Sequence, residues 1–247
     1  MFEAVSLSQI VSISAFAMFT SALTALVGAG GGTALLLVML YFLPTSSVIP
    51  VHGCIQLISN TTRVYLFWKH MQWGIIIRFA SLMPLGVYLG LLLYNSISAD
   101  FLRVIIACSI ILSLFLRPST GSTDQKLPKS IFYAIGLLTG FGNMIVGVLS
   151  PLLASVLRFE NLSKEDTVGT LGFFGFAGNI FKVAGFTFVG FSFALYLPLL
   201  IPACVASILG GMLGKALLRR SSNKLFHYTF QAMIFLLSAN LILDIFI

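Results

Sequence analysis

The sequence predicts an all-α, polytopic membrane protein made of two inverted-topology repeats, each a glycine-broken, re-entrant helical hairpin followed by three transmembrane helices. Three observations support this fold class. Hydrophobic residues form 58% of the 247-residue chain and charged residues only 9%, whereas a soluble domain carries about 25% charged residues. Apolar segments recur along nearly the whole chain, and at about 20 residues per span they leave no room for a separate soluble domain. The two halves also present similar segments in the same order.

The first element is a pair of apolar segments, 10–27 and 34–43, separated by a glycine-rich break. Four of the five residues from Gly28 to Gly32 are glycine. Each Gly lowers helix stability by about 1 kcal/mol relative to Ala, and irregular backbone at membrane depth lies against protein or a water-filled cavity. We therefore expect a break that lines a binding site. Close packing between helices is the alternative use of the same glycines.

The next element, 48–68, carries a polar stripe within an apolar segment. His52, Gln56, Asn60 and Arg63 follow the spacing i, i+4, i+8 and i+11, which places them on one face of an α-helix. Because ionisable residues are costly inside a bilayer, we expect this face to line a polar cavity. Hydrogen bonding between helices is the alternative for the stripe, and snorkelling to the cytoplasmic surface is the alternative for Arg63. Segments 74–94 and 101–116 complete the first repeat, 1–116.

A polar stretch, 117–129, follows and is predicted to be a cytoplasmic linker because it contains Lys126 and Lys129. The second repeat, 130–247, then presents the segments 131–141, 144–157, 167–188, 193–218 and 225–247. Its polar and small residues match those of the first repeat in order. The matching features are the break Gly140 to Asn143, the polar residues Thr170, Asn179 and Lys182, and the step Gly210 to Gly214, which corresponds to Gly86 to Gly90.

The distribution of basic residues favours hairpins that return to the side where they enter. In that topology the basic residues around positions 69, 117–129, 158–164 and 219–224 all face the cytoplasm, as the positive-inside tendency requires. If each glycine-broken pair crossed the membrane only once, the last of these groups would face outwards. The segment 10–27 is long enough to span a bilayer by itself, which is the alternative to re-entry.

The polar residues inside the apolar segments indicate a site for an anion. The acidic residues Asp100, Glu160, Glu165, Asp166 and Asp244 fall in loops or near segment ends, unlike the buried acid typical of cation carriers. Helix N-termini bind anions through backbone N–H groups, and the breaks predict such starts at Thr33 and near Met144. The expected substrate-binding residues are Gly31, Gly32, Thr33, His52, Gln56, Asn60, Asn143, Thr170 and Asn179, with Arg63 and Lys182 attracting the anion at the two mouths.

Other functional classes fit the sequence poorly. The apolar segments contain no paired carboxylates, no Ser–His pair at helical spacing and no cluster of metal ligands, so we expect neither an enzyme nor a metal or cofactor site. The net charge of +7 fits membrane topology and calls for no nucleic-acid partner. The expected partners are a small anionic substrate and the lipid bilayer. The glycine steps are also compatible with a homo-oligomer.

Several motifs together resemble the TauE/SafE family of membrane proteins, also called sulfite exporters. These are Gly28 to Gly32, Pro50-Val51-His52, the basic loop in mid-chain, Pro151 and Val168-Gly169-Thr170. The resemblance covers nearly the whole chain. Gly30 to Gly32, His52 and Gly169-Thr170 fall on motif positions of the family, whereas Gly140 to Asn143 contains fewer glycines than the family's usual second run.

The resemblance implies a multi-pass permease of the bacterial inner membrane. It would export small sulfur-containing anions such as sulfite, sulfoacetate or other organosulfonates. From the breaks and the polar residues we expect alternating access, with the anion bound between the two breaks. A permease for a different small solute and a non-transporting membrane scaffold are the alternative functions.

Overall fold

The computed structural model describes residues 5–94, 96–98, 101–102, 104–106, 108, 127–147, 149–160 and 162–218, and at positions 27, 151, 155 and 158 the backbone alone. Within these ranges every regular element is helical, as predicted. Most of segment 101–116, the linker up to residue 126 and segment 225–247 lie outside the described residues. The helices are α1 (Leu7–Val27), α2 (Gly31–Phe42), α3 (Thr45–Leu66), α4 (Trp73–Tyr94), α6 (Ile131–Ile145), α7 (Ser150–Leu157), α8 (Lys164–Phe188) and α9 (Leu197–Leu218), with short 3-10 helices η1 (Trp68–His70), η2 (Arg158–Glu160) and η3 (Phe193–Tyr196).

The first break lies where the glycines predict it. Helix α1 begins at a capping box, in which the Ser6 and Gln9 side chains each accept a hydrogen bond from the other residue's backbone. It ends at Gly28, which has the left-handed φ of 91° that favours glycine. Gly30 has a φ of 99° and precedes the first residue of α2. Two left-handed glycines therefore reverse the chain between two apolar helices.

Helices α1 and α2 form a hairpin. The Gln9 side chain, at the start of α1, donates from Nε2 to the carbonyl oxygen of Phe42 at the end of α2, at 2.6 Å. The chain thus comes back to the end of the bundle from which α1 started. Helix α1 also has the length and hydropathy of a membrane span.

The second break lies between Ile145 and Ser150, six residues later than Gly140 to Asn143, and that prediction is wrong. Helix α6 continues through these residues to Ile145, and the chain turns before Ser150, with Gly147 at a φ of 84°. The reason is that Gly140 packs against α4, where an added Cβ would collide with the Met83 carbonyl oxygen. The glycine serves close helix packing instead, and the following half-helix starts at Ser150 rather than near Met144.

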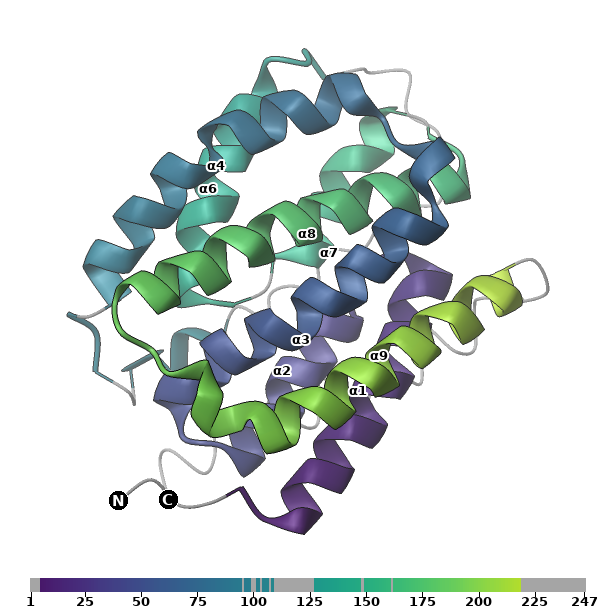
Figure 1. Cartoon of the computed structure of the whole chain (residues 1–247). Helices are drawn as coiled ribbons and strands as arrows, with labels where there is room; N and C mark the ends of the chain where they lie inside the picture. Colours follow the sequence, from purple (N-terminus) through teal and green to yellow (C-terminus); the bar gives the residue numbers. More distant parts are fainter. Residues whose placement is uncertain are drawn as a thin grey trace.

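Helices α3 and α8 pack together at the centre, with α4 and α6 on one side and α1 and α9 on the other (Figure 1). In both outer pairs the two helices are in close contact at a pair of glycines spaced four residues apart. A Cβ at Gly86 or Gly90 would meet the backbone of α6, and a Cβ at Gly210 or Gly214 would meet the backbone of α1. In each pair the residue numbers rise together along the contact, so the two helices run parallel.

The composition of the helices is that of a multi-pass membrane protein. Among the described residues four helices are long and apolar enough to cross a bilayer, namely α1, α4, α8 and α9 together with η3. Helices α2 and α6 are apolar but shorter. Large apolar side chains such as Tyr88 and Leu92 on α4 and Ile201 and Val205 on α9 are exposed, as expected for helices that face lipid.

Candidate functional site

Five helices contribute to one small cavity of about 30 Å³ near the centre of the molecule. It takes residues from the start of α2, from α3, α6 and α8, and from the second break and the start of α7. Six of the predicted site residues line it: Gly32, His52, Gln56, Asn60, Asn143 and Asn179. The polar stripe of α3 therefore faces a cavity, as its spacing predicts.

His52 joins the first break to α3. Its Nε2 lies 2.9 Å from the carbonyl oxygen of Gly32, and because a carbonyl oxygen only accepts, Nε2 is the donor. Its Nδ1 is buried and has no hydrogen-bond partner among the described residues. This contact fixes the ring beside the N-terminal turn of α2.

The amide side chains in the cavity are accommodated by glycines on α8. A Cβ at Gly175 would lie 2.5 Å from Nδ2 of Asn60, and a Cβ at Gly178 would lie 2.8 Å from Nδ2 of Asn143. Asn179 donates from Nδ2 to the Gly175 carbonyl oxygen of its own helix, at 2.7 Å. Small residues on α8 thus let amides from α3 and α6 reach the same space.

Two half-helix starts also meet at the cavity. Gly32 lies in the first turn of α2 and Ser150 is the first residue of α7, and both line it. The first turn of a helix has N–H groups without partners inside the helix and carries a partial positive charge. The cavity is therefore suited to oxygen atoms that carry negative charge.

Arg63 and Lys182, which were expected to attract the anion at the two mouths, are both buried. Their exposed fractions are 3% and 1%. Lys182 donates from Nζ to the carbonyl oxygen of Gly147 at 2.6 Å, and Arg63 donates from Nη1 to that of Gly28 at 3.3 Å. Each cation reaches a backbone carbonyl at a break because its long side chain turns inwards rather than towards water. Among the described residues no Asp or Glu is buried as a whole residue, although Oε1 of the half-buried Glu160 is buried.

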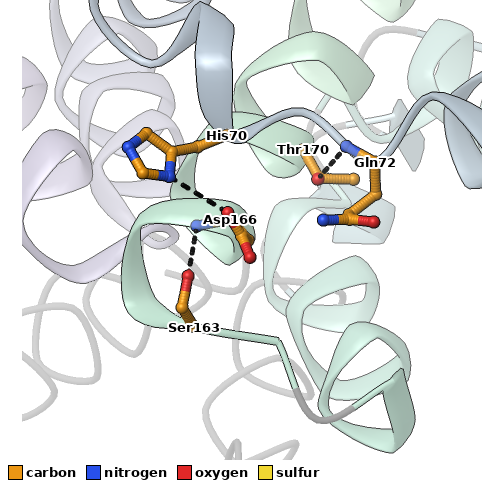
Figure 2. A network of polar contacts seen from close by, with 5 residues as sticks. All are labelled: His70, Gln72, Ser163, Asp166 and Thr170. Atoms are coloured by element: carbon orange, nitrogen blue, oxygen red, sulfur yellow. Dashed lines mark hydrogen bonds and ion pairs between the residues drawn. The ribbon is translucent and has the colours of Figure 1, made fainter.

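Thr170 is buried but does not line the cavity. Its hydroxyl accepts a hydrogen bond from the backbone N–H of Gln72, at 3.3 Å. Figure 2 shows this contact beside the pair formed by His70 and Asp166, whose Nδ1 and Oδ1 atoms are 3.1 Å apart. Thr170 thus holds the turn between η1 and α4 against α8.

Two other predicted residues are also outside the cavity lining. Gly31 packs against α1, where a Cβ would collide with the Thr20 carbonyl oxygen. The hydroxyl of Thr33 is buried and has no hydrogen-bond partner among the described residues. Of the glycine run, only Gly32 borders the cavity directly.

Sequence reasoning missed half of the residues that line the cavity, four of them because it placed the second break too early. The missed residues are Gly147, Leu149, Ser150, Leu153, Phe174 and Gly175. One signal was present in the sequence. The same difference in residue number separates Gly28 from Gly147, Asn60 from Asn179 and Arg63 from Lys182. Aligning the halves on the two asparagines would have placed the second break at Gly147.

The described residues contain no group of three or more His, Cys, Asp or Glu side chains that would hold a metal ion. Comparison with known proteins gave one result. A family model described as "Sulfite exporter TauE/SafE" matches residues 13–241. No match was found among curated proteins or among solved structures. The matched range takes in both breaks, the polar stripe and both buried cations, and it confirms the resemblance seen in the motifs. The chain therefore belongs to the sulfite exporter TauE/SafE family of membrane proteins.

Proposed function

We propose that this protein is a secondary transporter that exports small sulfur-containing anions, such as sulfite, sulfoacetate or other organosulfonates. The anion binds in the cavity between the starts of α2 and α7 and is released by alternating access. Family membership supports the class of transporter. The choice of an anion and of its site comes from the cavity itself.

One observation carries the proposal: two half-helix starts and several amide side chains converge on a single cavity. Sulfite and sulfonate groups present three oxygen atoms that accept hydrogen bonds, and N–H donors at helix starts bind such groups. The amides of Gln56, Asn60, Asn143 and Asn179 can offer further donors. The buried cations Arg63 and Lys182 add positive charge nearby, where the low dielectric strengthens their effect.

The size of the cavity favours a small ligand. Pockets for drug-sized molecules enclose about 300–1,000 Å³, whereas this cavity encloses about 30 Å³. Phe174 and Leu153 border it on apolar sides. A compact oxyanion matches such a space better than a large organic solute does.

We also propose that the two repeats are inverted in the membrane, with re-entrant hairpins α1–α2 and α6–α7 that enter from opposite faces. The parallel packing of α1 on α9 and of α6 on α4 supports this symmetry. Lys69, Lys164 and Lys215 lie near the ends of helices that meet at one end of the bundle, where Phe67, Val168 and Leu218 cluster. We assign that end, together with the linker 117–129, to the cytoplasm and place the protein in the bacterial inner membrane.

A thermal-shift screen of the purified protein tests the proposal. The panel contains sulfite, sulfate, thiosulfate, taurine, sulfoacetate and simple carboxylates, with chloride as the reference salt. Because a ligand stabilises the folded state by RT ln(1 + [L]/Kd), a concentration of 100 Kd adds about 2.7 kcal/mol. We expect stabilisation by at least one sulfur oxyanion. Stabilisation by carboxylates alone would indicate a permease for another solute, and no stabilisation by any anion would favour a scaffold.

A further inference from the structure

Both breaks are contacted in the same way by a buried cation from the long helix that follows. Arg63 donates to the carbonyl oxygen of Gly28 and Lys182 to that of Gly147. The two residues of each pair are 35 positions apart in the sequence. Both glycines have a left-handed φ, of 91° and 84°. The two halves therefore repeat the same contact, a hydrogen bond from a buried cation to the carbonyl oxygen of a left-handed glycine, although the cation is Arg in one half and Lys in the other.

The chemistry of a break explains why such a contact is needed. Where a helix stops inside a membrane, its last carbonyl groups lose their partners within the helix, and an unpaired carbonyl in an apolar setting costs on the order of several kcal/mol. A cationic donor forms a stronger hydrogen bond than a neutral one. One buried side chain can therefore fix the carbonyl, the left-handed turn and the direction of the half-helix that starts three residues later.

We propose that Arg63 and Lys182 are positioning residues that hold the starts of α2 and α7 in place at the cavity. Neither cation lines the cavity, whereas the half-helix that follows each contacted glycine does, through Gly32 and Ser150. Each cation acts through the break beside it. The N–H groups of α2 and α7, together with the cavity amides, meet the substrate.

The surroundings of both side chains fit a positioning role. Arg63 also donates from Nη2 to Oδ1 of Asn60, so that it orients a cavity amide as well as the first break. The stem of Lys182 crosses Gly53, where a Cβ would lie 2.7 Å from its Cδ atom. The absence of a side chain at Gly53 thus leaves space for the Lys182 side chain to reach Gly147. Asn179 precedes Lys182 by the same three residues as Asn60 precedes Arg63.

The consequence for substrate affinity rests on the proposed function, whereas the consequence for the breaks does not. The variants to compare are Lys182→Met and Arg63→Met, with Arg63→Lys as the conservative variant. Lys215→Met is the control, because Lys215 is an exposed cation whose Nζ donates to the Leu66 carbonyl oxygen at 2.8 Å and not to a carbonyl of either break. Hydrogen exchange of the backbone amides and sulfite titration by thermal shift are measured on the same purified proteins.

We expect Lys182→Met to raise amide exchange at the start of α7 at least tenfold and to leave the start of α2 unchanged. Arg63→Met should do the reverse. Both variants should weaken sulfite affinity about tenfold or more, Arg63→Lys should recover much of the protection and affinity, and Lys215→Met should match wild type. If a Met variant does not fold, Lys182→Gln and Arg63→Gln, which keep a neutral donor, serve in its place.

Three outcomes would overturn the positioning role. Weaker sulfite binding with unchanged amide exchange at the breaks would indicate that the cations contact the substrate directly. Unchanged exchange with unchanged affinity would indicate that the cations have no role at the site. Exchange that rises equally throughout the protein would mark a general loss of stability and would also contradict the proposal. If wild type does not bind sulfite, the proposed substrate fails while the exchange data still decide the role of the cations.

Discussion

Asn143 and Thr170 are both polar residues within apolar helices, but their surroundings differ. Asn143 borders the cavity, and Nδ2 of its amide would be 2.8 Å from a Cβ at Gly178. The Thr170 hydroxyl already accepts a hydrogen bond from the Gln72 backbone N–H. Thr170 lies one helical turn before Phe174, which does border the cavity. Of these two residues, Asn143 alone lines the cavity of the proposed anion site.

We predict that Asn143→Leu weakens sulfite binding roughly tenfold or more, because a hydrogen bond to a charged group contributes about 1.5–3 kcal/mol. Thr170→Val should leave affinity unchanged and lower the free energy of unfolding by about 1 kcal/mol, since it removes only the acceptor for the Gln72 N–H. Thermal-shift titrations of both variants measure affinity and stability together. Equal losses of affinity in the two variants would contradict this assignment.

The sequence predicts polar residues of the cavity well where their spacing defines a face. His52, Gln56 and Asn60 lie on one stripe of α3, and all three reach the cavity. The depth of a residue along its helix is not encoded in that spacing. For this reason the sequence predicted neither that Thr170 lies one turn beyond the cavity nor that Arg63 and Lys182 end at backbone carbonyls of the breaks.

At the scale of the helices, glycine has two uses that look alike in the sequence. At Gly28 and Gly147 it provides a left-handed turn, with φ of 91° and 84°. At Gly86 and Gly140 it allows α4 and α6 to approach, because a Cβ at either position would meet a backbone carbonyl of the other helix. The sequence predicted the first break because four glycines gather there. It misplaced the second because the packing partner of α6 was unknown.

The packing role predicts different effects for two glycines of α4. Gly86→Ala should destabilise the protein by about 1–3 kcal/mol, the usual cost of overpacking, because the new methyl group meets the Leu137 carbonyl oxygen. Gly74→Ala is the control, since the nearest atom to its Cβ is Nη1 of the Arg78 side chain at 3.6 Å. It should cause no loss and a gain of up to about 1 kcal/mol from helix propensity. Thermal unfolding in detergent compares the two, and similar stabilities would argue against close packing of α4 on α6.

At the scale of the whole molecule, the paired hairpins predict which loops share a face of the membrane. Gln9 bonds to Phe42, so the start of α1 and the start of α3 should lie on the outer face together. Single cysteines at the exposed positions Ser8, Ser46 and Ser130, in a variant without native cysteines, report their sides by labelling with a membrane-impermeant reagent. We expect labelling of Ser8→Cys and Ser46→Cys from outside intact cells and protection of Ser130→Cys. Labelling of Ser8→Cys and Ser46→Cys from opposite faces would contradict the re-entrant hairpin.

The central claim is that an anion crosses the membrane through the cavity between the two breaks. Counterflow of radiolabelled sulfite into proteoliposomes loaded with unlabelled sulfite tests it most directly. Wild type and Thr170→Val should accumulate label transiently above empty liposomes, and Asn143→Leu should show a strongly reduced initial rate. Accumulation by wild type no greater than in empty liposomes, or an undiminished rate in Asn143→Leu, would contradict the claim.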